Sequence, residues 1–394
     1  MAIRFIRTRW TVSYLGIGVF SWFGGCHSGN RTPGEIEGNQ RGFVTTAADN
    51  RLANRCAVDP AGDLESRINV NPEYVLSYRS GADACSVRTP TTQNRMIHHQ
   101  GIQRIFRGGF NFFVVTSSVR NATTGFEVVQ LGSVGSTPLA LGSNAAPGSL
   151  PLCEDRVVAY GVSPEDDRDH TGGIQVMGST LIVPMEDSSY RQPGAFRLVD
   201  LEGPTTPVLG GLISRQDGDR WHAGGAALTR LADGLFLAMI FGWDADEAEL
   251  FLSSDSTLAL STSEWTSVWQ GAMPSTFQAY QNLQFITRCD GQLFLLGTYR
   301  NGATDNNADL WQFSLSLEGI TANLSLTKTI SVTLRCRSTH TEDETYCDFN
   351  AGAGAYVSAE GQVYAYGVEQ YNDAVPGSDL GVKVREFAID PPID

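Results

Sequence analysis

Short apolar segments separated by turns recur along most of the chain, and they follow one layout five times. Each copy begins with a strand rich in small residues, turns tightly into a strongly apolar strand, crosses a polar loop and ends in an alternating strand. The first strands of the copies read GIQRIF, GGIQVMG, GGAALTRL, NLQFITR and AGAGAYVS. Apolar runs of this length, joined by turns such as Asp-Gly, predict strands and hairpins. The sequence therefore predicts an all-β chain built from one repeated unit.

The segments between successive copies supply a fourth candidate strand in four cases. We expect these strands at residues 156–162, 208–214, 266–271 and 324–333. Four antiparallel strands per repeat is the layout of a β-propeller blade. The sequence thus predicts a β-propeller of about five four-stranded blades, near residues 99–162, 170–214, 222–271, 280–333 and 349–389.

The fifth copy leaves no room for a fourth strand before the chain ends at Asp394. A propeller can complete its last blade with a strand from the other end of the chain, which removes an open sheet edge. The segment EYVLSY, within residues 72–80, is suited to this closing role. A β-sandwich or a pair of β domains would also explain the strands, and a sixth blade within residues 42–94 would change the count.

The N-terminal region has the pattern of an export signal. Residues 1–25 contain Arg4, Arg7 and Arg9 and no acidic residue, followed by an apolar stretch from Trp10 to Phe23. A basic start and an apolar run too short to span a bilayer are typical of a secretory signal peptide. Residues 26–42 are polar and rich in glycine, which predicts a flexible tether before a propeller domain at 43–394.

The signal ends in Phe23-Gly24-Gly25-Cys26. This motif resembles the lipobox of bacterial lipoproteins, and the resemblance implies that Cys26 is lipidated and becomes the mature N-terminus. Several acyl chains on one residue would give a stable membrane anchor. His27 follows the cysteine, and the resemblance then implies an outer-membrane or cell-surface location.

Cysteine usage agrees with export. Cys26 is one of 7 cysteines, and the even number that remains is typical of disulfides in an oxidising compartment. We predict a Cys336–Cys347 disulfide around a polar loop and a Cys56–Cys85 disulfide in the N-terminal segment. Cys153–Cys289 follows by elimination, and free buried thiols are the alternative for this last pair. The absence of a Cys-x-x-Cys motif gives no support to a zinc ribbon.

The charge of the chain excludes one class of partner. Lys and Arg number 28 against 43 Asp and Glu, a formal net charge of −15. Such a surface repels nucleic acid, so no nucleic-acid partner is expected. Acidic runs such as residues 165–169 have no EF-hand spacing and are read as solvated loops. We predict no cofactor, although a metal ion is possible.

Histidine precedes the first strand in three successive copies, as His99, His170 and His222. The fourth and fifth copies have Tyr280 and Asn350 near the corresponding place. The first strands of a propeller line its central channel and begin at one mouth. These side chains should therefore surround a single opening.

Three interpretations of this ring remain open. The three imidazoles could bind zinc or another transition metal. They could instead form a ligand pocket together with Trp221 and the residues of the fourth and fifth copies. The third interpretation is structural, with hydrogen bonds between neighbouring blades. Asp169, next to His170, is the candidate catalytic carboxylate if the chain hydrolyses a carbohydrate.

Ser253-Ser254-Asp255, followed by Trp265, resembles a degenerate Asp-box, the turn motif of sialidase-type propellers. The glycine and threonine of that motif are absent, and the motif is a structural turn, so the resemblance implies a propeller and no catalytic residue. The first functional hypothesis is a lipid-anchored, non-enzymatic propeller that binds a glycan or an envelope protein at its mouth. The alternatives are a secreted carbohydrate-active hydrolase and a structural envelope protein.

Overall fold

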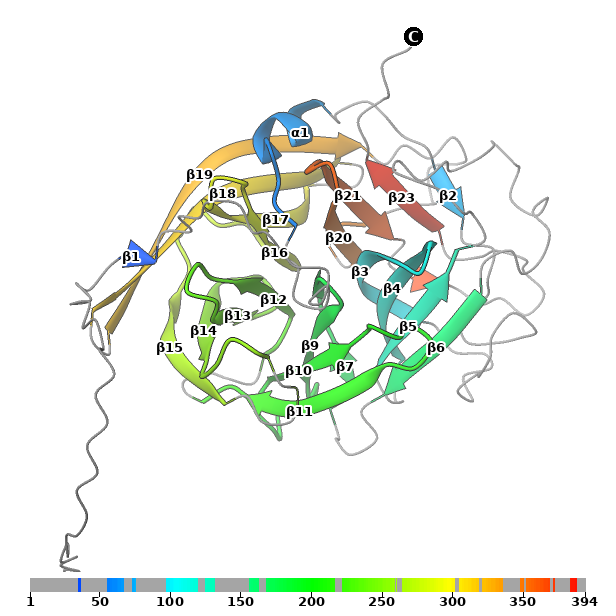
Figure 1. Ribbon diagram of the computed structural model, residues 1–394, viewed down its shortest axis with the longest axis horizontal. Helices are drawn as coiled ribbons and strands as arrows, with labels where there is room; N and C mark the ends of the chain where they lie inside the picture. Colours follow the sequence, from blue (N-terminus) through cyan, green and yellow to red (C-terminus); the bar gives the residue numbers. More distant parts are fainter. Residues whose placement is uncertain are drawn as a thin grey trace, which may run out of the picture. The chain divides into compact units, whose positions relative to one another are not determined.

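Antiparallel sheets hold most of the chain that the computed structural model describes (Figure 1). The described residues are 35–36, 55–66, 73–75, 97–119, 125–131, 156–162, 168–216, 222–258, 260, 264–301, 305–318, 321–335, 348–350, 352–368, 371–372 and 383–387. All of them belong to one compact unit, Pro33–Asp394.

The first three blades follow one another along the chain. Blade 1 consists of β3 (Ile97–Arg107), β4 (Phe110–Val119), β5 (Gly125–Gln130) and β6 (Arg156–Val162). Blade 2 consists of β7 (His170–Thr171) and β8 (Gln175–Met177), which share the first position, then β9 (Thr180–Glu186), β10 (Ala195–Asp200) and β11 (Val208–Ser214). Blade 3 consists of β12 (Gly225–Arg230), β13 (Phe236–Phe241), β14 (Glu247–Ser253) and β15 (Trp265–Ala272).

The last two blades use both ends of the described chain. Blade 4 consists of β16 (Asn282–Thr287), β17 (Leu293–Asn301), β18 (Asp305–Glu318) and β19 (Thr321–Arg335), and β1 (Glu35–Ile36) pairs with the end of β18. Blade 5 consists of β20 (Gly352–Val357), β21 (Val363–Val368), β23 (Lys383–Phe387) and β2 (Glu73–Val75).

The five blades form a closed ring. The first strands contact one another in the cyclic order β3, β8, β12, β16, β20 and back to β3, as Figure 1 shows. β2 pairs with β23, with Glu73 opposite Arg385, so the N-terminal strand completes the last blade. The prediction of a five-bladed propeller with this closure is confirmed. A second link, in which β22 (Tyr371–Asn372) pairs with β3, was not predicted because it lies in a polar loop.

Each blade is sandwiched between two others, so both of its faces are apolar. Strand β13 reads FLAMIF and is buried at every position. Leu237, Met239 and Phe241 face blade 4, whereas the alternating residues Phe236 and Ile240 face blade 2. This is the two-residue period of a strand, and it explains why the central strands are continuous apolar runs.

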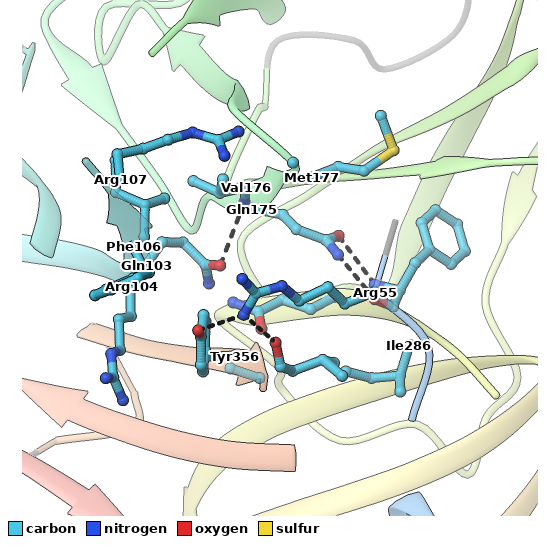
Figure 2. Close-up of a pocket in the computed structure, with 16 residues that line it drawn as sticks. Arg55, Gln103, Arg104, Phe106, Arg107, Gln175, Val176, Met177, Ile286 and Tyr356 are labelled. Carbon is cyan, nitrogen blue, oxygen red and sulfur yellow. Dashed lines mark hydrogen bonds between the residues drawn. The ribbon is translucent and has the colours of Figure 1, made fainter. Parts of the chain in front are cut away.

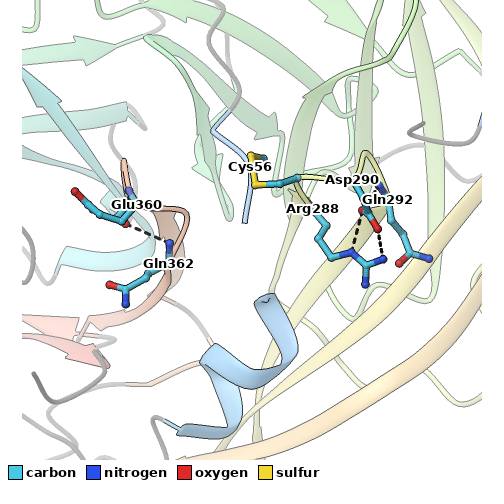
Figure 3. Close-up of a disulfide and its surroundings, with 8 residues drawn as sticks. Cys56, Arg288, Asp290, Gln292, Glu360 and Gln362 are labelled. Carbon is cyan, nitrogen blue, oxygen red and sulfur yellow. Dashed lines mark hydrogen bonds and ion pairs between the residues drawn. A yellow bond between two sulfur atoms is a disulfide. The ribbon is translucent and has the colours of Figure 1, made fainter. Parts of the chain in front are cut away.

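The N-terminal segment joins blades 4 and 5 at the turn side of their first hairpins (Figure 3). Cys56 forms a disulfide with Cys289, 233 residues away. The backbone of Ala57 bonds to Thr287 and Cys289. The predicted pairs Cys56–Cys85 and Cys153–Cys289 are therefore wrong, because ring closure brings two distant cysteines together. The predicted Cys336–Cys347 pair lies outside the described residues.

A short helix, α1 (Pro60–Ser66), follows this segment and was not predicted. The side chain of Asp59 accepts a hydrogen bond from the backbone N–H of Gly62 (3.1 Å), and Pro60 occupies the first helical position. Asp-Pro at these two positions is a recognised helix start. Among the helices that the structure describes, none is long and apolar enough to cross a membrane.

Three glutamines fill the centre of the ring, one each from blades 1, 2 and 4. Gln175 accepts hydrogen bonds from the backbone N–H groups of Leu228 and Phe285, both at 3.0 Å. Gln284 donates to the carbonyl of Ile174 at 3.1 Å, and Gln103 accepts from the backbone of blade 2. Blades 2 and 4 are not neighbours, so the bonds between Gln175 and Phe285 and between Gln284 and Ile174 cross the channel.

Candidate active site

A buried carboxylate lies at the mouth where the first strands begin. Glu186 ends β9, and its side chain is 0 % exposed. Its Oε1 accepts a hydrogen bond from Trp243 Nε1 at 2.5 Å, and its Oε2 accepts one from the backbone N–H of Ala223 at 2.8 Å. These two hydrogen bonds hold the carboxylate of Glu186 in place beneath this mouth.

Two histidines lie against the two oxygens of Glu186. His170 Nδ1 is 3.3 Å from Oε1, and His222 Nδ1 is 3.9 Å from Oε2. The side chain of His170 is 17 % exposed and that of His222 is 36 % exposed. The imidazoles therefore form the outer surface of the site, and Glu186 supports them from below. The carboxylate lies beside both rings, although neither Nδ1 atom has a hydrogen-bond partner among the described residues.

Two exposed aromatic side chains border the histidines. Trp243 is 43 % exposed and Tyr190 is 47 % exposed. The indole ring lies 5.4 Å from the ring of His170 and 5.9 Å from that of His222, and Tyr190 lies 5.1 Å from His222. Gln281, at the start of blade 4, donates to the carbonyl of Trp243. The mouth thus carries imidazoles and flat apolar faces side by side.

Glycine allows the blades to approach closely here. A Cβ atom at Gly172 would lie 1.8 Å from the carbonyl oxygen of Gly224, and a Cβ at Gly224 would lie 2.6 Å from the Cα of Trp243. The backbone of Gly173 donates to Gly224 at 3.0 Å. These contacts hold the loops that carry His170 and His222 against each other.

Blade 1 contributes His98 to the cluster. The rings of His98 and His170 are 6.2 Å apart, whereas His99, the predicted residue, is 1 % exposed. Side chains alternate along a strand, and the register of β3 shifts between His99 and Gly101. The histidine one position earlier in the sequence therefore reaches the mouth. Burial, followed by the nearby His170 and His99, lowers the pKa of His98 to about 3.

We expect His98 to make the protein less stable in mild acid. The unfolded chain takes up a proton near pH 6.5, whereas folded His98 remains neutral down to about pH 3, so protonation favours the unfolded state in this window. His98 alone should lower the free energy of unfolding by about 2 kcal/mol between pH 7 and pH 5. Urea unfolding at both pH values checks this. His98→Gln should show a smaller loss, and an equal loss in both proteins would contradict the prediction.

Asp169 lies beside the cluster. Its carboxylate accepts hydrogen bonds from the backbone N–H and the hydroxyl of Ser188, at 2.8 and 2.6 Å. Its backbone N–H donates to the carbonyl of Glu186. Asp169 therefore supports the start of the loop that presents Tyr190.

The remaining predicted residues lie elsewhere. Tyr280 is 0 % exposed, and its hydroxyl donates to Asp309 at 2.5 Å, so it belongs to the core and not to an open pocket. Asn350 is exposed in the turn before β20, where its backbone donates to Asp348 at 2.9 Å. Trp221 lies outside the described residues. Tyr280 is a core residue because its apolar ring packs between blades 3 and 4.

No group of three or more His, Cys, Asp or Glu side chains in the described part of the chain is arranged to hold a metal ion. His99, His170 and His222 are all among the described residues.

Sequence reasoning missed Glu186, Trp243, Tyr190 and His98. Glu186 ends the apolar strand TLIVPME, and Trp243 follows the apolar strand FLAMIF. The available signal was their position in the repeat. Glu186 and Trp243 stand at the ends of the second strands of blades 2 and 3, and a repeated histidine precedes the first strand of each of these blades.

The comparisons with known proteins find a likeness among solved structures and none by sequence. No protein-family model and no curated protein matches the sequence. Among solved structures, a GH32 β-fructofuranosidase from Bombyx mori is similar with a TM-score of 0.44 and 10% identity, over 82% of this chain and 64% of that one. A GH43_1 enzyme from Xanthomonas citri is similar with a TM-score of 0.39 and 8% identity, over 83% and 93% of the two chains.

An exo-β-1,3-galactanase from Phanerochaete chrysosporium is also similar, with a TM-score of 0.38 and 12% identity, over 80% of this chain and 64% of that one. This chain thus spans less than two thirds of the β-fructofuranosidase and of the galactanase. These neighbours are enzymes, and the prediction of a non-enzymatic binding propeller is replaced by its hydrolase alternative. At these TM-scores and identities the likeness carries no role over to this chain.

Proposed function

We propose that this protein is a carbohydrate-active hydrolase whose site is the mouth formed by His170, His222, Glu186, Trp243 and Tyr190. The observation that carries the proposal is a buried carboxylate in contact with two partly exposed imidazoles. An imidazole can accept or donate a proton near neutral pH, so two of them at one site can divide these roles. Such a pair supplies an acid and a base at the same time, which hydrolysis requires.

In the proposed reaction the two histidines divide the roles of base and acid. The neutral imidazole removes a proton from water as the water oxygen bonds to the carbon under attack. The imidazolium gives its proton to the oxygen of the leaving group as the bond between that oxygen and the carbon breaks. After the reaction one of the two histidines is again protonated and the other is neutral. Glu186 is a positioning residue, because its 0 % exposed side chain meets the rings and not the substrate.

The aromatic side chains favour a sugar as the substrate. Sugar rings present flat C–H faces, which pack on exposed indole and phenol rings, while their hydroxyl groups bond to polar neighbours. Trp243 and Tyr190 offer such faces on both sides of His222, and the Gln281 side chain lies beside Trp243.

The test is the release of reducing sugar from oligosaccharides with fructosyl, xylosyl and galactosyl linkages. The unmodified protein should cleave at least one of them. His170→Gln and His222→Gln should each reduce kcat/KM by about 100-fold, because both rings are partly exposed and their loss should leave the fold intact. Glu186→Gln should reduce kcat/KM by about tenfold or more and also shift the pH profile. Full activity in both histidine variants would overturn the proposal.

Two carboxylate variants serve as comparisons. Glu264→Gln changes an exposed acid before β15 and should leave activity unchanged. Asp169→Asn tests the earlier hypothesis that Asp169 is the acid or base. A loss in Asp169→Asn together with full activity in the histidine variants would assign the chemistry to Asp169 instead.

We propose further that the protein is exported and anchored to the outer membrane or cell surface through Cys26. This part rests on residues 1–42, whose sequence has the signal and lipobox patterns. The Cys56–Cys289 disulfide supports it, because disulfides persist in oxidising compartments. A glycan at the cell surface would then be within reach of the site.

A further inference from the structure

A second polar site lies at the opposite end of the ring. The first strands begin at the mouth that carries His170 and His222, and their far ends surround a cavity of about 120 Å³ (Figure 2). The cavity is lined by β3, β8, β16 and β20 and by Arg55 of the N-terminal segment. This cavity has no role in the proposed hydrolysis.

The lining contains three arginines and no acidic residue. Arg104 is buried and lies 3.5 Å from Glu386, and Arg107 lies 3.6 Å from Glu202. Each of these two cations therefore has a carboxylate partner that is not part of the cavity lining.

Arg55 differs from the other two arginines. Its guanidinium donates to the hydroxyl of Tyr356 and to the carbonyl of Val357 at 3.4 Å, both neutral groups. Among the residues that the structure describes, no carboxylate forms an ion pair with it. The Cys56–Cys289 disulfide holds the adjacent backbone in place. A positive charge therefore lines the cavity, and the part of the chain that the structure describes supplies no carboxylate to pair with it.

Gln103 adds an unpaired donor. The residue is 2 % exposed, and its Oε1 accepts a hydrogen bond from the backbone of Val176 at 3.3 Å. Its Nε2 is buried and has no hydrogen-bond partner among the described residues. Figure 2 shows this amide and the Arg55 guanidinium turned toward the same space. Gly354 lies beside Nε2, where a Cβ would be 2.9 Å away, so this position of blade 5 has no side chain to cover the amide.

Buried hydrogen-bond donors are almost always paired in proteins, so the unpaired Gln103 amide beside the Arg55 guanidinium points to a missing acceptor. The acceptor must be negatively charged to balance Arg55, and a planar carboxylate matches the fork of a guanidinium. We propose that this cavity binds a small carboxylate, held by the Arg55 guanidinium and the Gln103 amide. The site is independent of the histidine mouth, and its ligand binds without being cleaved.

The experiment compares sodium acetate with sodium chloride at equal ionic strength, using the purified chain at pH 7. Acetate should raise the melting temperature and give a saturable heat of binding, because a ligand of the folded state stabilises it. Acetamide has the same shape without the charge and should have no effect. Arg55→Gln should weaken acetate binding at least tenfold. Arg230→Gln, which removes an arginine outside the cavity lining, should bind acetate as the unmodified protein does.

In Gln103→Glu, the new side-chain carboxylate takes the place of the bound carboxylate. The added carboxylate oxygen occupies the place of Nε2 and faces Arg55, so this variant should melt a few degrees higher without acetate and should no longer respond to it. Arg55 is exposed, so Arg55→Gln remains informative if the Gln103 variant folds poorly.

Equal effects of acetate and chloride on the unmodified protein would overturn the proposal. A response to phosphate without a response to acetate would also overturn it, since it would assign the site to a tetrahedral anion. Acetate binding should persist in His170→Gln, so failure of the hydrolase proposal and failure of this one are separate results.

Discussion

Replacement of Gln175 by leucine is expected to lower the free energy of unfolding by about 3–5 kcal/mol. The Gln175 side chain accepts from the backbone of Leu228 and Phe285, both at 3.0 Å, and donates to the carbonyl of Phe285 at 2.8 Å. Leucine has a similar size but no polar atoms. Three buried backbone groups would lose their partners, and each unpaired group costs about 1–3 kcal/mol.

The measurement is urea unfolding of Gln175→Leu with Gln312→Leu as the control. Gln312 is an exposed glutamine in β18, so its replacement should change stability by less than about 0.5 kcal/mol. Because Gln175 connects blades 2, 3 and 4, its variant should also unfold with lower cooperativity. Equal stability of the two variants would show that the glutamines merely occupy space in the channel.

Replacement of Asp309 by leucine should have a comparable effect, about 3–5 kcal/mol. Asp309 in β18 is 0 % exposed and accepts from Tyr280 at 2.5 Å, Ser331 at 2.5 Å and Lys328 at 2.6 Å. Burial and the bond to Asp309 raise the pKa of Tyr280 far above its ordinary value, so its hydroxyl stays protonated and remains a donor. Leucine would leave this donor and the Lys328 ammonium without their acceptor.

A double-mutant cycle separates the charge from the hydrogen bonds. Lys328 lies over the ring of Trp311 at 4.8 Å, and its side chain is 34 % exposed. Lys328→Met should be destabilising by itself, because it leaves the buried Asp309 carboxylate without its cation. In the Asp309→Leu background, Lys328→Met should recover part of the lost stability, since the unpaired ammonium is removed. Strict additivity of the two changes would contradict a coupled pair.

Much of the architecture follows from the sequence alone. The two-residue period of strands such as β13 and the recurring tight turns indicate sheets packed on both faces. The shortened fifth copy indicates that an N-terminal strand closes the ring. These features can be predicted because they depend on the local sequence of each strand and on a pattern that is repeated in every blade.

The site residues depend on ring closure instead. Glu186, His222 and Trp243 come from different strands, and their contacts exist only once blades 2 and 3 are packed together. One shift in the register of β3 decides that His98 and not His99 reaches the mouth.

Ring closure also explains why the disulfides were predicted wrongly and why distant residues meet in the channel. Cys56 and Cys289 meet because the last blades close over the N-terminal segment. Gln175 bonds to Phe285 across the channel although a hundred residues separate them. The sequence by itself determined the repeated unit, the number of blades and the closing strand. The tertiary structure alone decided which side chains meet, because contacts across a ring join residues that no local pattern relates.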